Sequence, residues 1–261
     1  MSSPGSSELL AQAHALSETL ATREGDARWA VISALHERPE PLVFDTCSCW
    51  AVSRHAFERA LAADILGQLG GRDCVFPFRD ASLMLLARLL ADAAPEVQRC
   101  ALVALSHLGA TEHADAVRCL ASHEHAGVRY GVAVALLGDA HPESVRVMIE
   151  LSRDQDAEVR DWATFGLGAQ IDVDTIEVRE ALWSRCSDLD PAIRAEGIAG
   201  LARRGDPRAV DVLRRVLQSE DVGSLEVGAA RDLASPELLD ALESLRSWWD
   251  VDSALLEEAI A

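Results

Sequence analysis

The chain has 261 residues, with 43 acidic and 24 basic side chains, a formal net charge of −19, 49% apolar residues and 5% aromatic residues. A protein that tracks DNA needs lysine and arginine along its surface to displace counterions from phosphates, and this sequence has no basic run that could do so. No segment approaches 18 uninterrupted apolar residues, so we expect neither a nucleic-acid partner nor a membrane span.

The first seven residues are polar, and no apolar segment follows them, which predicts that the chain carries no secretory signal peptide. We expect residues 1–7 to be disordered and residues 8–261 to form a single domain located in the cytoplasm. The six cysteines would remain reduced in that compartment.

Amphipathic segments separated by glycine, proline and aspartate predict paired helices along the whole chain. The first helices of the pairs are expected at 8–22, 40–50, 79–92, 111–122, 141–153, 174–187 and 206–219. The second helices are expected at 26–37, 54–69, 95–108, 125–138, 156–170, 190–204 and 222–233. A helix at 235–246 and a tail at 250–260 would close the C-terminal end.

One leucine recurs in the second helix of every pair and sets the register of the repeat. The row consists of Leu35, Leu66, Leu105, Leu136, Leu167, Leu201 and Leu233. A small or β-branched residue stands four positions before each leucine, and an apolar residue usually stands eight before it. Positions i, i+4 and i+8 share one helix face, so the pattern predicts a buried stripe. A repeated stripe of this kind predicts an all-α solenoid of about seven helix pairs.

The string V-R-x-x-A-x-x-x-L after an acidic turn resembles the HEAT-like repeat of phycobilisome-lyase-type proteins. Val159 to Leu167 is the sharpest copy, and Ile193 to Leu201 is another. The resemblance covers residues 8–246 and extends to bacterial HEAT-repeat proteins of unassigned activity. It implies an α-solenoid with a C-terminal capping helix, and the motif specifies the fold rather than a function.

The arginine of the repeat forms a ladder with acids of neighbouring repeats in HEAT arrays, and the resemblance implies the same here. The expected members are Arg129, Arg160, Arg194, Asp156 and Asp190. The two aspartates also stand where helix N-cap residues are expected. Gln98 and Glu226 occupy the arginine position in two repeats, which implies that the ladder is interrupted there.

Two groups of residues have side chains that commonly bind metals. One contains Cys47, Cys49, Cys74 and His55, and the other contains His113, His123 and His125. A C-x-C spacing is not the C-x₂₋₄-C spacing common in zinc sites. Two histidines two positions apart face different ways on a helix, so only a loop could bring both to one ion. We therefore predict no metal and no cofactor, and the lack of a G-x-S-x-G or comparable signature predicts no catalytic residue.

The expected functional surface is a row on the second helices, one and five residues after the arginine position. Such helices line the concave face of a solenoid, which is a common binding surface. The candidates are Arg99, Tyr130, Asp161, Trp162 and Phe165. Exposed aromatic residues with arginine are favoured anchors of protein interfaces. The alternative is that Trp162 and Phe165 pack between adjacent repeats.

These features favour a non-catalytic scaffold or adaptor that binds a protein partner on its concave face. The acidic surface suits a basic partner. Two alternatives remain open. One is an inhibitor or immunity-type protein that neutralises a basic toxin. The other is an enzyme or enzyme-maturation subunit resembling the lyase-type HEAT proteins.

Overall fold

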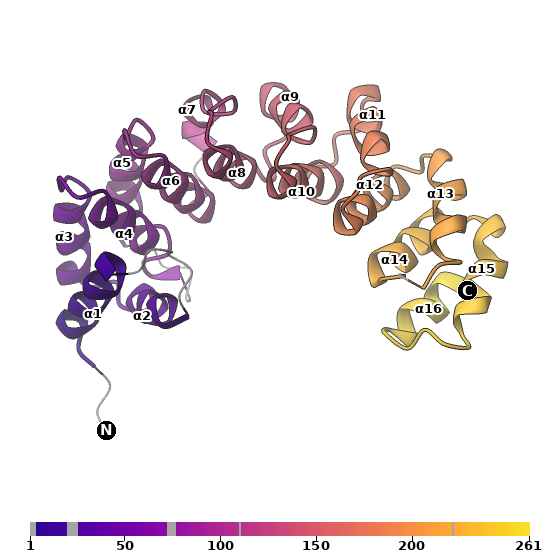
Figure 1. Cartoon of the computed structure of the whole chain (residues 1–261), viewed down its shortest axis with the longest axis horizontal. Helices are drawn as coiled ribbons and strands as arrows, with labels where there is room; N and C mark the ends of the chain where they lie inside the picture. Colours follow the sequence, from indigo (N-terminus) through magenta and orange to yellow (C-terminus); the bar gives the residue numbers. More distant parts are fainter. Residues whose placement is uncertain (1–3, 20–25, 72–76, 110, 221) are drawn as a thin grey trace. The chain divides into compact units, whose positions relative to one another are not determined.

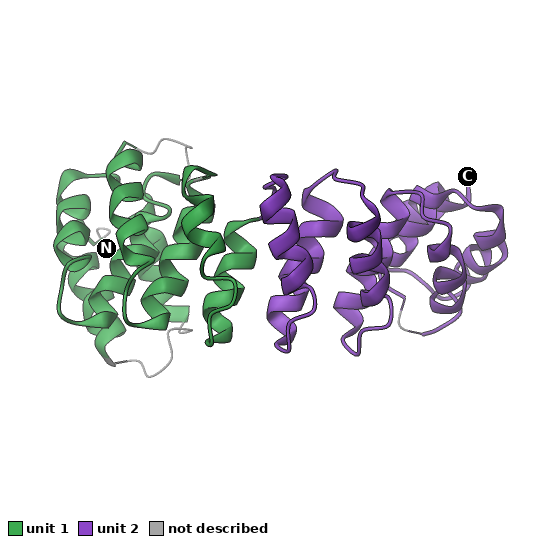
Figure 2. Ribbon diagram, turned by 90° about the horizontal axis from the view of Figure 1, so that it is seen from above, with its two compact units in different colours: residues 1–136 green, residues 137–261 purple. Residues whose placement is uncertain are grey.

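The computed structural model describes residues 4–19, 26–71, 77–109, 111–220 and 222–261. All regular elements within these ranges are helical. The chain divides into two compact units, residues 1–136 (unit 1) and residues 137–261 (unit 2), which Figure 2 shows in different colours. None of the described helices combines the length and apolar character required to cross a bilayer.

The described residues of unit 1 form eight α-helices, which are arranged as successive pairs (Figure 1). They are α1 (Ser6–Thr19), α2 (Asp26–His36), α3 (Pro41–Trp50), α4 (Ala56–Leu66), α5 (Arg79–Leu89), α6 (Pro95–His107), α7 (Ala114–Arg118, after a 3₁₀ turn at Thr111–His113) and α8 (Ala126–Ala135). Helices α4, α6 and α8 pack against one another in that order and form an inner layer.

Unit 2 repeats the arrangement of paired helices in its described residues (Figure 1). Its helices are α9 (Pro142–Leu151), α10 (Ala157–Phe165, continued by a π-helical turn at Gly166–Gln170), α11 (Ile176–Arg185), α12 (Pro191–Arg203), α13 (Arg208–Val216), α14 (Ser224–Leu233), α15 (Leu239–Leu245, after a 3₁₀ turn at Pro236–Leu238) and α16 (Ser253–Ile260). Helices α10, α12, α14 and α16 are neighbours in that order and form the inner layer of this unit.

The predicted leucine row is confirmed as a buried stripe in six of its seven positions. Leu35, Leu66, Leu105, Leu136, Leu167 and Leu201 are all buried. Leu233 is only partly buried. The row one residue after the arginine position was expected to face away from the core, and for Ala60, Ala195 and Val227 that expectation is wrong because all three are buried. Small and β-branched side chains at this position fit between neighbouring inner helices.

Glycines in the second helices allow those helices to approach closely. A Cβ atom on Gly200 would lie 2.8 Å from the Cα atom of Gly168, and one on Gly67 would lie 2.7 Å from the Cα atom of Ala104. Contacts this short cannot be accommodated against backbone. The close approach offsets the roughly 1 kcal/mol by which glycine is less favourable than alanine within a helix.

The helix boundaries agree with the expected ranges to within a few residues. Helix α1 begins at Ser6, within the segment expected to be disordered, and residues 1–3 of that segment lie outside the described residues. The predicted N-caps are confirmed. A carboxylate oxygen of Asp156 accepts from the backbone N–H groups of Glu158 and Val159, and one of Asp190 accepts from Ala192 at 2.9 Å.

Candidate functional site

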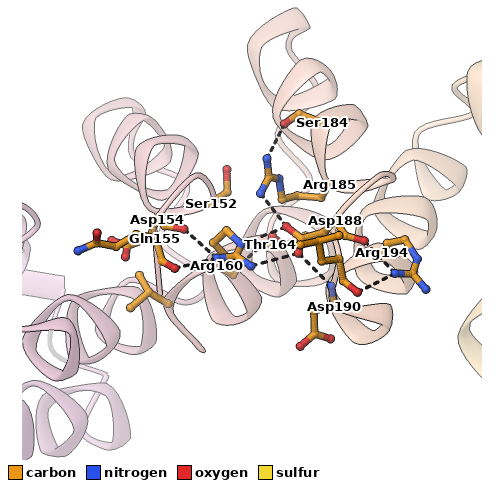
Figure 3. A network of polar contacts seen from close by, with 12 residues as sticks. Ser152, Asp154, Gln155, Arg160, Thr164, Ser184, Arg185, Asp188, Asp190 and Arg194 are labelled. Carbon is orange, nitrogen blue, oxygen red and sulfur yellow. Dashed lines mark hydrogen bonds and ion pairs between the residues drawn. The ribbon is translucent and has the colours of Figure 1, made fainter. Parts of the chain in front are cut away.

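A bidentate ion pair links two successive helix pairs of unit 2 (Figure 3). Nε and Nη2 of Arg160 donate to the two carboxylate oxygens of Asp188 at 3.0 and 3.1 Å. Nη1 of Arg160 donates to the backbone carbonyls five and six residues before it, which end the turn between α9 and α10. One guanidinium therefore closes its own turn and holds the next one, using the planar fork of donors that only arginine has.

Asp188 is the centre of this network. It also accepts from Nη1 of Arg185 at 2.8 Å and from the backbone N–H of Asp190 at 3.2 Å. Burial opposes its ionisation, but the hydrogen bonds from Arg160 and from the backbone hold the pKa of Asp188 below its usual range. Nη1 of Arg194 donates to the carbonyls of Asp188 and Leu189 and repeats the turn-closing contact of Arg160 (Figure 3).

The acids assigned to the ladder from the sequence require a correction. Asp156 and Asp190 direct their carboxylates at the first turns of α10 and α12. The ion-pair partner of Arg160 is instead Asp188, two residues earlier than Asp190. Unit 1 has the same arrangement, in which Arg59 donates to both oxygens of Asp92 at 2.6 and 2.8 Å. A sequence signal exists for this acid, because an aspartate six residues before the arginine position recurs at Asp92, Asp154 and Asp188.

The two repeats without arginine contain other contacts at this position. The amide of Gln98 donates to the carbonyl of Leu90 at 3.1 Å, and a carboxylate oxygen of Glu226 accepts from the N–H of Gly223 at 3.0 Å. Each contact closes a local turn. Arg129 donates to the carbonyls five and six residues before it, as Arg160 and Arg194 do.

Several of the residues considered as metal ligands have structural contacts. Cys47 lies fully in the core of unit 1, and burial raises the pKa of its thiol well above the usual range. The ring nitrogens of His123 and His125 accept from backbone N–H groups two residues ahead. Cys74 lies outside the described residues. Within the described ranges, no three potential ligands gather around a common point.

The five candidate interface residues are divided between the two units. Arg99 and Tyr130 lie half-buried on α6 and α8 of unit 1. In unit 2, Asp161, Trp162 and Phe165 lie on α10 and are also half-buried, less exposed than a free anchor would be. The rings of Trp162 and Phe165 meet edge to face with centroids 6.0 Å apart.

A groove crosses the inner layer of unit 2 and has a volume of about 360 Å³. It runs over α10 with its π-helical turn, α12, α14 and α16. Phe165, Leu225 and Leu255 provide its apolar walls, and the side chain of Leu225 is 45% exposed. Glycine and alanine residues of α12 and α14 form most of the floor, which explains why the groove is open.

Two carboxylates without a cation among the described residues lie in or beside this groove. Glu196 is a lining residue, and Asp161 lies one helical turn before Phe165 on the same face of α10. Burial raises the pKa of both, reinforced by the charge of Asp190 at Asp161 and by the charge of Asp161 at Glu196. Neither forms an ion pair with any residue that the structure describes.

The basic residues of the groove are already engaged. Arg231 pairs with Asp232 at 2.9 Å and with Glu258 at 3.4 Å, and Arg203 donates to the carbonyl of Ala169. The groove therefore has apolar walls, and among its charged lining residues Glu196 is the one without an ion pair in the described part of the chain. Glu196, Leu225 and Leu255 were not among the interface residues predicted from the sequence. A signal existed only for Glu196, which occupies the position of Trp162 in the following repeat.

Stacked helix pairs joined by an arginine–aspartate ladder define an α-solenoid, in which each repeat contacts its neighbours. The family model for HEAT repeats matches residues 82–168 and 145–234, more than half of the chain. The chain belongs to the HEAT-repeat family, and the prediction of an all-α solenoid of HEAT-like pairs is confirmed.

Similar proteins support the same fold. Protein YibA of Escherichia coli K12 is 28% identical over 133 residues, which cover 51% of this chain and 47% of YibA, so the sequence match spans about half of that relative. The crystal structure of the E. coli protein YibA superposes over 100% of this chain and 98% of its own, with a TM-score of 0.75 and 20% identity.

More distant structures share the architecture alone. Kap121p matches with a TM-score of 0.66 and 13% identity over 90% of this chain and 28% of its own. The CpcE–CpcF complex of phycocyanin lyase from Nostoc sp. PCC7120 matches with a TM-score of 0.51 and 15% identity over 95% and 96% of the two chains.

Proposed function

We propose that this protein is a non-catalytic interaction scaffold of the cytoplasm that binds a protein partner through the inner helix layer of unit 2. The observation that supports this most is the groove over α10, α12, α14 and α16, where Phe165 and the exposed Leu225 accompany unpaired carboxylates. Protein interfaces combine apolar or aromatic anchors with a polar rim in the same way. Asp161 and Trp162 flank this groove on α10.

Arg99 and Tyr130 are proposed as further contact residues on the inner layer of unit 1. Both are half-buried side chains of residue types enriched at interface anchors. The ladder residues Arg129, Arg160, Arg194, Asp156 and Asp190 are proposed to have structural roles, as helix caps and as links between turns, rather than roles in binding. The described contacts of their side chains are to backbone groups and to neighbouring repeats.

Affinity capture from the native host with quantitative mass spectrometry tests this proposal. We expect Phe165→Ala to weaken capture of a stoichiometric protein partner by about 1–4 kcal/mol, as truncation of an anchor does. Ile176→Ala provides the matched control, because Ile176 lies on the outer helix α11 and is 75% exposed. This control should capture the partner as the unchanged protein does.

Two outcomes would contradict the proposal. If Phe165→Ala leaves capture unchanged and lowers only the melting temperature, Phe165 is a packing residue between repeats. If a small molecule and no stoichiometric protein is recovered, the scaffold function is wrong.

A further inference from the structure

We infer that the groove of unit 2 binds a basic, amphipathic segment of a protein partner. A lysine or arginine of that segment would lie against Asp161 and Glu196, and its apolar side chains would pack against the walls of the groove. This inference rests on the proposed function and specifies the chemistry of the partner.

The unpaired carboxylates at the groove determine the sign of the charge that a bound segment must carry. Asp161 and Glu196 are half-buried on the neighbouring helices α10 and α12, and neither has a cation among the described residues. A partly buried carboxylate without a counterion is unfavourable, and an incoming cation forms a charge-assisted hydrogen bond in a partly desolvated place. A nucleic acid or a second acidic chain would meet repulsion here.

Gly228 supports binding of an apolar side chain, because helix packing does not require a glycine at this position of the groove. A Cβ atom on Gly197 would lie 2.9 Å from the carbonyl oxygen of Leu182, so the neighbouring helix requires that glycine. A Cβ atom on Gly228 would meet nothing within 4 Å. Gly228 lines the groove, and its missing side chain leaves space without any gain in helix packing.

Direct binding of a synthetic peptide tests the inference. The probe is a fluorescein-labelled amphipathic peptide of leucine and lysine, and the comparison peptide has glutamine in place of every lysine. We expect fluorescence anisotropy to report saturable binding of the lysine peptide and a loss of at least about tenfold for the glutamine peptide, which corresponds to about 1.4 kcal/mol. Equal binding of the two peptides would show that no cation is recognised and would overturn the inference, as would failure of the lysine peptide to bind.

Variants of the protein separate the groove from the general negative charge. We expect Glu196→Gln and Asp161→Asn each to weaken the lysine peptide about tenfold. Asp240→Asn removes one charge from the exposed surface of α15 and should leave its affinity unchanged. An equal loss for Asp240→Asn would show that the peptide senses only net charge and would contradict a specific site.

Gly228→Leu tests the apolar part of the groove without removing a charge. The leucine enters open space, so the variant should keep its melting temperature and lose at least about tenfold in peptide affinity. Binding of the lysine peptide at unchanged affinity would overturn the placement of its apolar side chains in this groove.

The sequence permits a second, chemical readout. The chain contains no lysine, so a carbodiimide that couples carboxylates to amines cannot form internal cross-links through a lysine side chain. We expect cross-links between the lysine peptide and Glu196 or Asp161, located by mass spectrometry, and cross-links elsewhere only would overturn the assignment. If the peptide fails but partner capture still depends on Phe165, the scaffold function stands and the basic-segment inference is wrong.

Discussion

Arg160 and Asp188 face each other between two helix pairs of unit 2, and both carboxylate oxygens accept from the same guanidinium (Figure 3). Asp188 is 5% exposed and also serves Arg185, so its removal leaves two arginines without their acid. We expect Asp188→Ala to lower the free energy of unfolding by about 3–5 kcal/mol, the range seen when one partner of a buried pair is lost. Urea denaturation of the variant and of the unchanged protein measures this difference in the free energy of unfolding.

The control for this prediction is Asp211→Ala. Asp211 pairs with Arg214 in the same unit but is 82% exposed, and exposed pairs contribute about 0–1 kcal/mol. A double-mutant cycle with Arg160→Ala should show coupling to Asp188. If the two single changes are additive, the ion pair does not link the repeats energetically.

A second prediction concerns the leucine row. Leu167 is fully buried, so Leu167→Ala should lower the free energy of unfolding by about 2–5 kcal/mol through lost burial and the cavity that remains. Leu189→Ala removes the same atoms from a side chain that is 96% exposed and should change stability by less than about 0.5 kcal/mol. Similar effects of the two changes would show that the repeat register is wrong.

Two glycine substitutions in the inner layer of unit 2 should have opposite effects. Gly200→Ala places a methyl group 2.8 Å from the Cα atom of Gly168 and should cost about 1–3 kcal/mol of stability. Gly228→Ala meets no atom and should stabilise the protein by about 0.4–1 kcal/mol, because alanine restricts the unfolded chain. Chemical denaturation of both variants decides this, and a stabilised Gly200→Ala would contradict the close helix contact.

A fourth prediction concerns pH. Burial raises the folded-state pKa of Asp161 and Glu196, so the folded protein binds these protons before the unfolded chain and gains stability as pH falls through the folded pKa values. Hydrogen bonds from Arg59 lower the pKa of Asp92, and those from Arg208 lower that of Asp206. The stability from these two is present above the unfolded pKa of about 3.9 and is lost as pH falls through their folded values.

Urea midpoints measured between pH 3 and pH 7 should therefore contain a rise on acidification that comes from Asp161 and Glu196, and should fall again below about pH 4. His36 and His107 oppose the rise, because burial lowers their pKa values and the unfolded chain binds these protons first. Glu196→Gln should reduce the rise, because it removes one of the groups responsible, while the fall at lower pH should persist. An identical rise of the urea midpoint in this variant would show that folding does not raise the pKa of Glu196.

The helices and their register could be predicted because a buried stripe depends only on the helical period. The acid that pairs with Arg160 was harder to predict from the sequence. Asp188 and Asp190 both stand before α12 at plausible positions, and only the folded turn shows which carboxylate faces Arg160 and which caps the helix.

The groove was only partly predictable. Phe165 could be identified from its offset on α10, but Leu255 reaches the same groove from a helix outside the repeat pattern. The π-helical turn after Phe165 was also not expected. The carbonyls of Leu167 and Gly168 in this turn accept from Arg204, as does that of Ile171 just after it. These contacts join residues more than 30 positions apart, and no local pattern reveals them.

The ion pairs of Arg59 and Arg160 span different lengths of chain. Arg59 and Asp92 are separated by 33 residues, whereas Arg160 and Asp188 are separated by 28. The link depends on two turns and not on the number of residues between them, so the intervening first helix and its loops can differ in length from one repeat to the next. We expect a short insertion between Ile171 and Thr175 to disturb the contacts of Arg204 with the carbonyls of Ile171 and Val173 and yet to leave the Arg160–Asp188 pair in place.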